Sequence, residues 1–397
     1  MTLPAVGAKA RGLVPFSVLS ATYFAHVGFF NPYLPLWLKD LGLGLFTISL
    51  LTAAQSATRL LAPYAWGALS DRTGERVKLL RLAASAALLT SFGLWVDGGA
   101  WWLALVLAVT FTQTSAMMPM SEAAMSHLVS SAGSFDMRRY GRVRVWGSCG
   151  FLVTVLLAGV CFDVFGIRYF PMVATASLAA VVFSVWCLPD LKETVHAEQE
   201  RQALLPVLRQ RQVQWFFAAL FFHVLAHMGI YVFFSLYLDS IGYSKTVIGL
   251  LWAVSVLVEI AWFYWQGRWM PALSLSAWLV VSALVTTLRM GLTAGTATVL
   301  PLLVLAQLLH ALTFGAHHAA CIGLVSQHFP GRLRGRGQAL FTVAAYGLPG
   351  VLGGVLGGLL SARHGLQSIF WVCMASSLVA AACAFRVWRG SLPCARG

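Results

Sequence analysis

The chain has 397 residues, of which 59% are hydrophobic and only 10% are charged, against about a quarter charged in ordinary soluble domains. Its formal net charge is +14, but the basic residues are scattered over short polar intervals and are not gathered in one domain. This composition excludes a soluble protein and gives no support for nucleic-acid binding. It indicates an all-α integral membrane protein that contacts the lipid bilayer.

Twelve stretches are long and apolar enough to cross a bilayer, which takes about 20 residues in a helix. The first follows Lys9 and Arg11, but it is too long for the apolar region of a signal peptide, so we expect an uncleaved helix. The predicted spans are 13–38, 46–69, 79–97, 101–127, 139–163, 167–188, 213–238, 246–266, 273–292, 297–326, 337–361 and 366–388.

Lys and Arg are distributed unequally between the two sides of these spans. If the N-terminus is cytoplasmic, the outer side receives only Lys39, Arg168, Lys245 and Arg363. By the positive-inside rule both termini are then cytoplasmic. We expect a multi-pass protein of a bacterial inner membrane.

The longest polar interval, 189–212, divides the chain into an N-terminal half (1–188) and a C-terminal half (213–397). Each half has six predicted helices, and the second ends in a short cytoplasmic tail. Two pseudo-equivalent halves are the usual plan of a rocker-type secondary transporter. Within the interval, a short amphipathic helix is expected around 197–210.

Arg59 lies half-way along the second span. A cation there is costly unless it faces a cavity or pairs with an anion. Arg59 is therefore a candidate to hold an anionic substrate, with a structural ion pair as the alternative.

The next loop reads Gly67-Ala-Leu-Ser-Asp71-Arg72-Thr-Gly74-Glu-Arg76-Val-Lys78. This tight basic turn resembles the signature loop of the major facilitator superfamily, in which an acid and arginines latch neighbouring helices. The resemblance implies a conformational latch formed by Gly67, Asp71, Arg72, Gly74 and Arg76.

Glu122 and Glu259 are the only acidic residues in the interior of the apolar spans, since all other Asp and Glu lie in loops or at span ends. A carboxylate at a helix centre costs roughly 2.5–3.5 kcal/mol on insertion scales, so it is usually retained for a pathway, a proton relay or a ligand. Glu122 lies near the end of the fourth span and Arg144 near the start of the fifth. Both sit about 7 Å inside, at 1.5 Å per residue, so they can pair.

Two further stretches indicate a smaller group within this superfamily. They are Asn31-Pro-Tyr-Leu-Pro35-Leu-Trp37-Leu-Lys-Asp40 and Tyr140-Gly-Arg142-Val-Arg144-Val-Trp146-Gly147-Ser148. Both look like the phenylpropionate permease-like group, which is related to the oligosaccharide:proton symporters. The resemblance runs across nearly the whole chain and implies that Glu122 and Arg144 recognise substrate; a structural ion pair is the alternative.

In the second half, Glu259, Arg289 and His310 match positions of the proton-coupling cluster of those symporters. Thr313 departs from the pattern, because the symporters have a proton-releasing glutamate at the matching position. Proton coupling would then pass through Glu259, Glu122 or a histidine.

Several histidines share these helices. His310 and His317 are seven residues apart and should share a helix face, with His318 beside them, while His223, His227 and Tyr231 form a stripe at four-residue spacing. His227 and Tyr231 are candidate substrate-binding residues and His317 a candidate for proton coupling; structural hydrogen bonding is the alternative for each histidine. No acidic or cysteine partner lies nearby in sequence, so we expect no metal site.

Aromatic residues and small residues complete the pattern. Phe30, Tyr231 and Trp252 are candidates to line an aromatic pocket, and the seven cysteines are expected to be small core residues without disulfides. Gly350, Gly354 and Gly358 recur at four-residue spacing, which lets helix backbones approach closely.

Together these features predict a twelve-helix major facilitator that takes up a small organic molecule with protons by alternating access. An aromatic carboxylate such as a phenylpropionate-type acid is the first expected substrate, and a sugar or nucleoside the second. An uncoupled facilitator or exporter, a transporter-like sensor and a membrane-embedded enzyme are the rivals; the histidines do not form the nucleophile or metal set that an enzyme needs. We expect a monomer with no cofactor, driven by the proton gradient.

Overall fold

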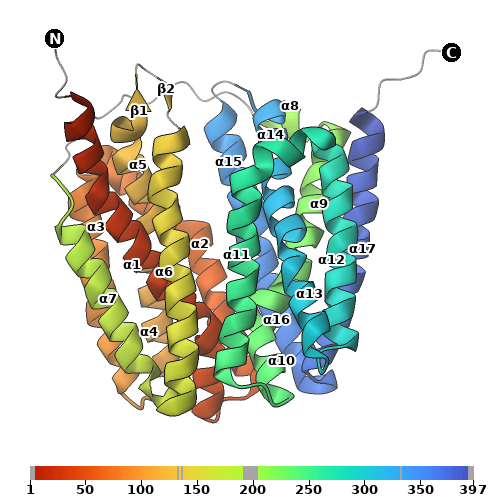
Figure 1. Cartoon of the computed structure of the whole chain (residues 1–397), viewed down its shortest axis with the longest axis horizontal. Coiled ribbons are helices and arrows are strands. Elements are labelled where there is room, and N and C mark those ends of the chain that lie inside the picture. Colours follow the sequence, from red (N-terminus) through yellow and green to blue (C-terminus); the bar gives the residue numbers. More distant parts are fainter. Residues whose placement is uncertain (1–4, 132–133, 136, 191–203, 331–332, 392–397) are drawn as a thin grey trace. The chain divides into compact units, whose positions relative to one another are not determined.

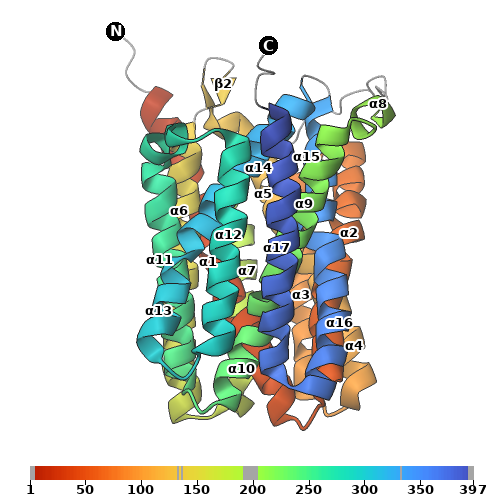
Figure 2. The same cartoon turned by 90° about the vertical axis from the view of Figure 1, so that its right-hand side faces the viewer.

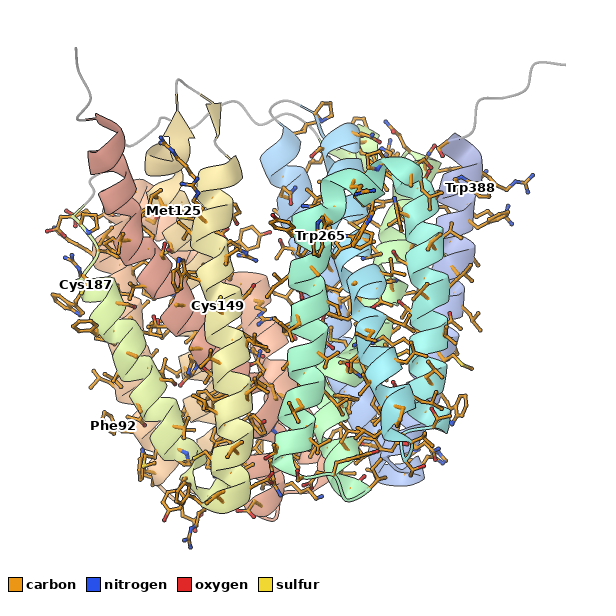
Figure 3. All side chains as sticks on the ribbon, in the orientation of Figure 1. Phe92, Met125, Cys149, Cys187, Trp265 and Trp388 are labelled. Atoms are coloured by element: carbon orange, nitrogen blue, oxygen red, sulfur yellow. The ribbon has the colours of Figure 1, made fainter. Side chains whose placement is uncertain are left out.

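The computed structural model describes residues 5–131, 134–135, 137–190, 204–330 and 333–391, nearly all of them helical. These residues contain twelve helical stretches long and apolar enough to cross a membrane. The predicted all-α fold class and the number of spans are confirmed. Large apolar side chains such as Phe92, which is 53% exposed, point outward from the helices, as lipid-facing side chains do (Figure 3).

Contacts group the chain into two units. The first unit comprises Met1–Leu43 and Ala57–Glu198, and the second comprises Gly44–Ser56 and Gln199–Gly397. The beginning of the second span therefore packs with the second unit, although the rest of that helix belongs to the first.

The first unit is coloured red to yellow-green in Figure 1. Long α1 packs against α6 and α7, and α3 packs against α4 and α7. Phe16, Leu80, Met117, Val143 and Val181 are buried together in its core. Its elements are α1 (Ala5–Asp40), α2 (Leu45–Thr73), α3 (Arg76–Ser91), η1 (Phe92–Trp95), α4 (Gly99–Thr114), α5 (Met117–Val129), β1 (Ser130–Ser131), β2 (Ser134–Phe135), α6 (Met137–Val164), η2 (Ile167–Tyr169) and α7 (Phe170–Trp186).

The part of the second unit from Gln199 onward is coloured green to blue, and Figure 2 shows it after a 90° turn about the vertical axis. Helix α17 packs along both α12 and α9. Its elements are α8 (Leu205–Leu208), α9 (Arg211–Met228), η3 (Gly229–Phe233), α10 (Phe234–Ser240), α11 (Lys245–Trp269), η4 (Met270–Ala272), α12 (Leu275–Gly295), α13 (Leu300–Leu308), η5 (Ala311–Ala316), α14 (His317–His328), α15 (Arg334–Thr342), η7 (Val343–Gly347), α16 (Leu348–His364) and α17 (Leu366–Ser391).

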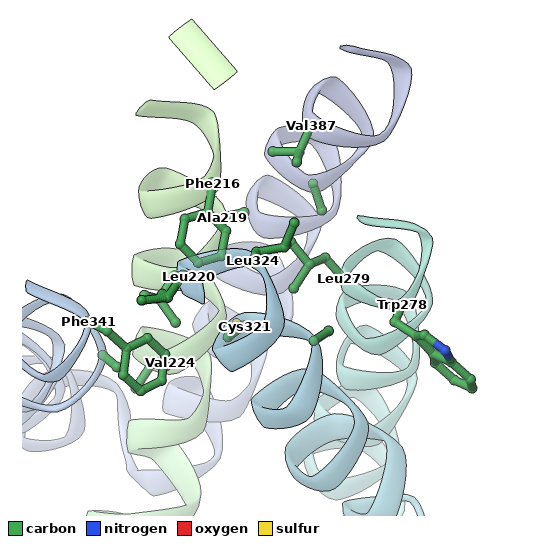
Figure 4. Close-up of a cluster of buried hydrophobic side chains, with 14 of the residues drawn as sticks. Phe216, Ala219, Leu220, Val224, Trp278, Leu279, Cys321, Leu324, Phe341 and Val387 are labelled. Atoms are coloured by element: carbon green, nitrogen blue, oxygen red, sulfur yellow. The ribbon is translucent and has the colours of Figure 1, made fainter. Parts of the chain in front are cut away.

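The core of the second unit lies between α9, α12, α14 and α17. Figure 4 shows Phe216 and Leu220 of α9 facing Leu324 of α14, with Leu279 of α12 and Val387 of α17 beside them. Cys321 is buried in the same cluster. The cysteines that the structure describes are free thiols, but the expectation that they are core residues is wrong for Cys149 and Cys187, which are exposed.

Three helices of the second unit contain π-helical turns, namely η3, η5 and η7. Such a turn carries an extra residue relative to α-helical winding and is frequent at functional sites. No sequence feature predicted them.

The predicted amphipathic helix at 197–210 falls largely outside the described residues. Its described part is the four-residue helix α8 (Leu205–Leu208), after which Arg209 and Gln210 form a turn before α9 begins.

The glycines of α16 lie against the first turns of α2, within the second unit. A Cβ at Gly354 would meet the Cβ of Ala53 at 2.5 Å and the backbone oxygen of Ser49 at 3.2 Å. A Cβ at Gly358 would overlap the side chain of Ser49. The expected close packing is therefore present, and its partner is α2.

We expect Gly354→Ala to lower the midpoint of thermal unfolding in detergent, because overpacking a tight contact typically costs about 1–3 kcal/mol. Gly141→Ala is the matched control, since that helical glycine has nothing within 4 Å of a Cβ. Alanine there should leave the midpoint unchanged or raise it, because Gly in a helix interior costs roughly 0.5–1 kcal/mol relative to Ala. Equal effects of the two substitutions would contradict the close contact.

Candidate functional site

Glu122 of α5 and Arg144 of α6 form an ion pair in the first unit. Arg144 Nη1 donates to Glu122 Oε1 at 2.8 Å, and the hydroxyl of Tyr140 donates to the same oxygen at 2.9 Å. Tyr140 lies one turn before Arg144 on α6, so both reach the carboxylate from one helix face. The structure thus brings the two predicted partners together and adds Tyr140, which the sequence analysis had not selected.

This ion pair is accessible. The side chains of Arg144 and Glu122 are 50% and 33% exposed, and the guanidinium of Arg144 lies over the ring of Phe24 at 5.3 Å. A guanidinium held by one carboxylate oxygen and one aromatic face keeps further N–H groups free to donate to a ligand.

Arg59 adds a second cation to the same region. The charges of Arg59, Arg144 and Glu122 all act on the hydroxyl of Tyr23. Within the described ranges Arg59 makes no hydrogen bond or ion pair. Two cations and one carboxylate therefore act on the same hydroxyl, and this set of charges is net positive.

A second polar cluster centres on Arg289 of α12, which is completely buried. Its Nη1 bonds His310 Nδ1 at 2.9 Å and the hydroxyl of Thr313 at 3.0 Å. Its Nη2 donates to Gln307 Oε1 at 3.0 Å, an oxygen that also accepts from Ser255 at 2.8 Å. A buried cation is tolerated only when it is paired and hydrogen-bonded in this way.

Glu259 of α11 is joined to this cluster through His310, whose Nε2 lies 3.3 Å from Glu259 Oε2. Arginine can only donate hydrogen bonds, so Nδ1 of His310 must accept. The proton of a neutral His310 then sits on Nε2 and points at the carboxylate. Arg289, His310 and Glu259 form one directed hydrogen-bond chain from a cation to an anion.

Three histidine rings stack beside Thr313, within the second unit. His223 and His317 are parallel to within 7°, with ring centroids 3.6 Å apart, and His227 stacks on His223 at 4.7 Å. His223 Nε2 bonds the carbonyl oxygen of Thr313 at 2.8 Å. His223, which the sequence analysis left outside its candidate set, is therefore the centre of the group.

A small cavity adjoins this stack. Its walls include His223, His227, His317, Tyr231, Phe314 and Tyr346, and the space for water centres is about 20 Å³. Of the three residues expected to line an aromatic pocket, only Tyr231 lies here. Phe30 is buried among other aromatic rings of the first unit, and Trp252 donates to the hydroxyl of Ser235 at 3.1 Å.

The predicted common face of His310 and His317 is wrong. His310 stacks on Phe314 at 5.2 Å, and Phe314 stacks on His318 at 5.8 Å, whereas His317 turns to His223. The π-helical turn η5 lies between the two histidines, so α-helical spacing does not apply to them.

The predicted latch lies at the end of α2 and the start of α3. Gly74 has φ of 67°, a left-handed conformation that favours glycine, and Arg76 Nε donates to the hydroxyl of Ser70 at 2.8 Å. Arg72 is exposed and Gly67 has open space around it. The side chain of Asp71 lies outside the described residues.

Metal coordination finds no support in the geometry. The described residues contain no group of three or more His, Cys, Asp or Glu that could hold a metal ion.

The comparisons with known proteins agree on one kind of molecule. Residues 16–372 match the MFS_1 like family. A probable 3-phenylpropionic acid transporter of Escherichia coli (strain K12) is 28% identical over 356 residues, covering 88% of this chain and 91% of that protein. A maltose permease of Geobacillus stearothermophilus is 27% identical over 292 residues, covering 71% of each chain.

Solved structures show the same fold. The nucleoside transporter NupG matches with a TM-score of 0.81 at 14% sequence identity, covering 95% of this chain and 98% of that chain. A D-xylose-proton symporter matches with a TM-score of 0.71 at 12% identity, covering 96% and 97%.

Proposed function

Because the chain belongs to the MFS_1 like family and is a transporter of the major facilitator type, not an enzyme, we propose that it takes up a small organic anion together with protons. The first proposed substrate class is an aromatic carboxylate of the phenylpropionate type. Transport proceeds by alternating access in a bacterial inner membrane, with both termini cytoplasmic. In this proposal the protein acts as a monomer, needs no cofactor and takes its energy from the proton gradient.

The observation that carries the proposal is the charge set of the first unit. Arg59 and Arg144 outnumber Glu122, and the Glu122–Arg144 pair is exposed while Arg289 is completely buried. A substrate carboxylate would neutralise the extra cation, and an arginine fork suits a carboxylate. The 28% identical relative named as a probable 3-phenylpropionic acid transporter supports the same class.

The proposed proton carrier is Glu259, supported by its contact with His310 and, through it, with Arg289. Protonation of the carboxylate would remove the anion at the end of the hydrogen-bond chain. The side chain of Thr313 is not acidic, but its hydroxyl accepts a hydrogen bond from Arg289. Asp71 and its neighbours are proposed as the latch between transport states.

A sugar or nucleoside is the second candidate, favoured by the paired state of Arg144. An arginine already bound to Glu122 offers N–H groups, and the carboxylate offers acceptors, which together suit hydroxyl groups. A putative nucleoside transporter of E. coli is 24% identical over 343 residues.

One experiment separates these classes. Purified protein is screened for ligand-induced thermal stabilisation with aromatic carboxylates, sugars and nucleosides, and the binders are then tested for uptake in proteoliposomes with and without an inward proton gradient. We expect stabilisation by aromatic carboxylates and uptake above equilibrium only with the gradient. Binding without any flux would indicate a sensor, and flux without accumulation a facilitator.

We expect Tyr140→Phe to weaken substrate binding roughly tenfold. The substitution removes one hydrogen bond to an ionised carboxylate, worth about 1.5–3 kcal/mol, and the partial exposure of the pair favours the lower end of that range. Isothermal titration of purified protein measures the change in Kd. Tyr64→Phe, at a side chain 48% exposed, is the control and should bind as the wild type does; equal losses would remove Tyr140 from the site.

A further inference from the structure

Backbone carbonyls fix the tautomers of two histidines beside the cavity of the second unit. His223 Nε2 lies 2.8 Å from the carbonyl oxygen of Thr313, and His227 Nδ1 lies 2.9 Å from the carbonyl oxygen of His223. A carbonyl oxygen accepts and never donates, so both of these ring nitrogens must carry hydrogen. In the neutral rings, His223 Nδ1 and His227 Nε2 are therefore left as lone-pair acceptors.

Both acceptors are buried without a partner. His223 Nδ1 and His227 Nε2 have no hydrogen bond among the described atoms, and the two side chains are only 2% and 3% exposed. Unpartnered polar atoms at such depth are rare, because each one costs the free energy of its lost hydration. Two of them on one cavity wall point to a ligand that brings a hydrogen-bond donor.

The size of the cavity limits that ligand. Its space for water centres is about 20 Å³, whereas one water needs about 10–15 Å³ and at least two polar partners. A sugar or an aromatic ring does not fit in this volume. A water, or a water with an extra proton, does.

We propose that His223 and His227 form a proton-binding site in this cavity, separate from the Glu259–His310 pair, and that they hold a single proton through a shared water. The proton enters on one free ring nitrogen, and the water donates to the other. No bond besides those to the proton is made or broken.

The stacking of the rings limits the site to one proton and stabilises that proton. Two imidazolium rings 4.7 Å apart would repel strongly in a buried setting, so a second proton is excluded. One imidazolium at His223 would lie between the faces of His227 and His317, and aromatic faces attract cations.

The surrounding charges come from every helix packed against the stack. Arg289 of α12 opposes a second positive charge, and Glu259 of α11, reached through His310, favours one. The other titratable neighbours are His317, His318 and Cys321 of α14, Tyr231 of η3 and Tyr346 of η7.

This inference rests on the proposed function only for the use of the proton in transport. The position of His223 next to Thr313 explains how the proton could affect transport. The carbonyl oxygen of Thr313 accepts a hydrogen bond from His223, and the hydroxyl of Thr313 accepts one from Arg289. A proton at His223 would therefore act on the Arg289 cluster through a single residue, Thr313.

The test counts protons on purified protein in detergent, without substrate. Protein labelled with ¹⁵N in its histidine rings is titrated between about pH 8 and 5, the range in which imidazoles commonly change charge. Ring-nitrogen resonances distinguish the two neutral tautomers from imidazolium. We expect one proton per molecule to be taken up by His223 and His227 together.

Two variants keep the carbonyl contacts and remove the acceptors. His223→Gln places an amide near the position of Nε2, and His227→Asn places one near Nδ1. Each should take up one proton fewer than the wild type over the same range. His26→Asn is the control, because His26 is equally buried in the first unit but has its Nδ1 bonded to Ser177 at 2.8 Å; it should lose none.

Several outcomes would overturn the proposal. These are no titration of either ring, two protons on the pair, or a loss in His26→Asn equal to that in the variants. Because no transport is measured, failure here leaves the proton-coupled uptake through Glu259 to be judged by its own assay.

Discussion

Replacing Glu259 with Gln is expected to abolish accumulation of substrate against its gradient while leaving substrate exchange intact. Gln retains the shape of the side chain and can accept from His310 Nε2 through its amide oxygen, as the carboxylate does at 3.3 Å. It cannot bind and release a proton. The coupling of proton and substrate should disappear, whereas movement of the site between the two sides should persist.

The measurement pairs two assays in proteoliposomes: uptake driven by a pH gradient, and exchange at equal pH. Asp97→Asn is the matched control, since Asp97 is an exposed acid in the turn between η1 and α4, and should accumulate substrate normally. If accumulation survives in Glu259→Gln and fails in Glu122→Gln, the proton carrier lies in the first unit and the assignment is wrong.

The second large effect is expected for Arg144→Lys, which should weaken substrate binding by about a hundredfold. Lysine can replace the single contact with Glu122, but it lacks the planar fork that binds a carboxylate with two parallel hydrogen bonds and stacks on Phe24. Loss of one or two charge-assisted bonds at about 1.5–3 kcal/mol each accounts for the size of the effect.

Arg142→Lys is the control for Arg144→Lys. Arg142 is exposed and lies on the same helix, two residues earlier, so it points to a different face. Titration calorimetry should give wild-type Kd for Arg142→Lys and a large loss for Arg144→Lys, with similar unfolding midpoints. Wild-type affinity in Arg144→Lys would remove Arg144 from the substrate site.

The sequence predicted well those features that depend on helix length and depth. The pairing of Glu122 with Arg144 could be expected because antiparallel helices joined by a short loop bring residues of equal depth together. Arg289 and His310 were selected from the family pattern, and they are in contact.

Other features depend on details that periodicity does not carry. Tyr140 and Gln307 were missed because a hydroxyl and an amide are common in helices and gain importance only from the charged group they contact. His223 was undervalued because its role depends on a carbonyl of another helix. The packing of α2 onto α16 was missed because small residues give no sign of their partner.

The π-helical turn η5 sets the rotational register of all that follows it on α14. Each residue turns an α-helix by about 100°, so deleting one residue between Ala311 and Ala316 and restoring α-helical winding would rotate His317 away from His223. Arg289 would still meet His310, which precedes the turn, but the histidine stack would be lost. Among related chains, an insertion or deletion of one residue at this point would therefore decide whether a stack can exist, even where every histidine is retained.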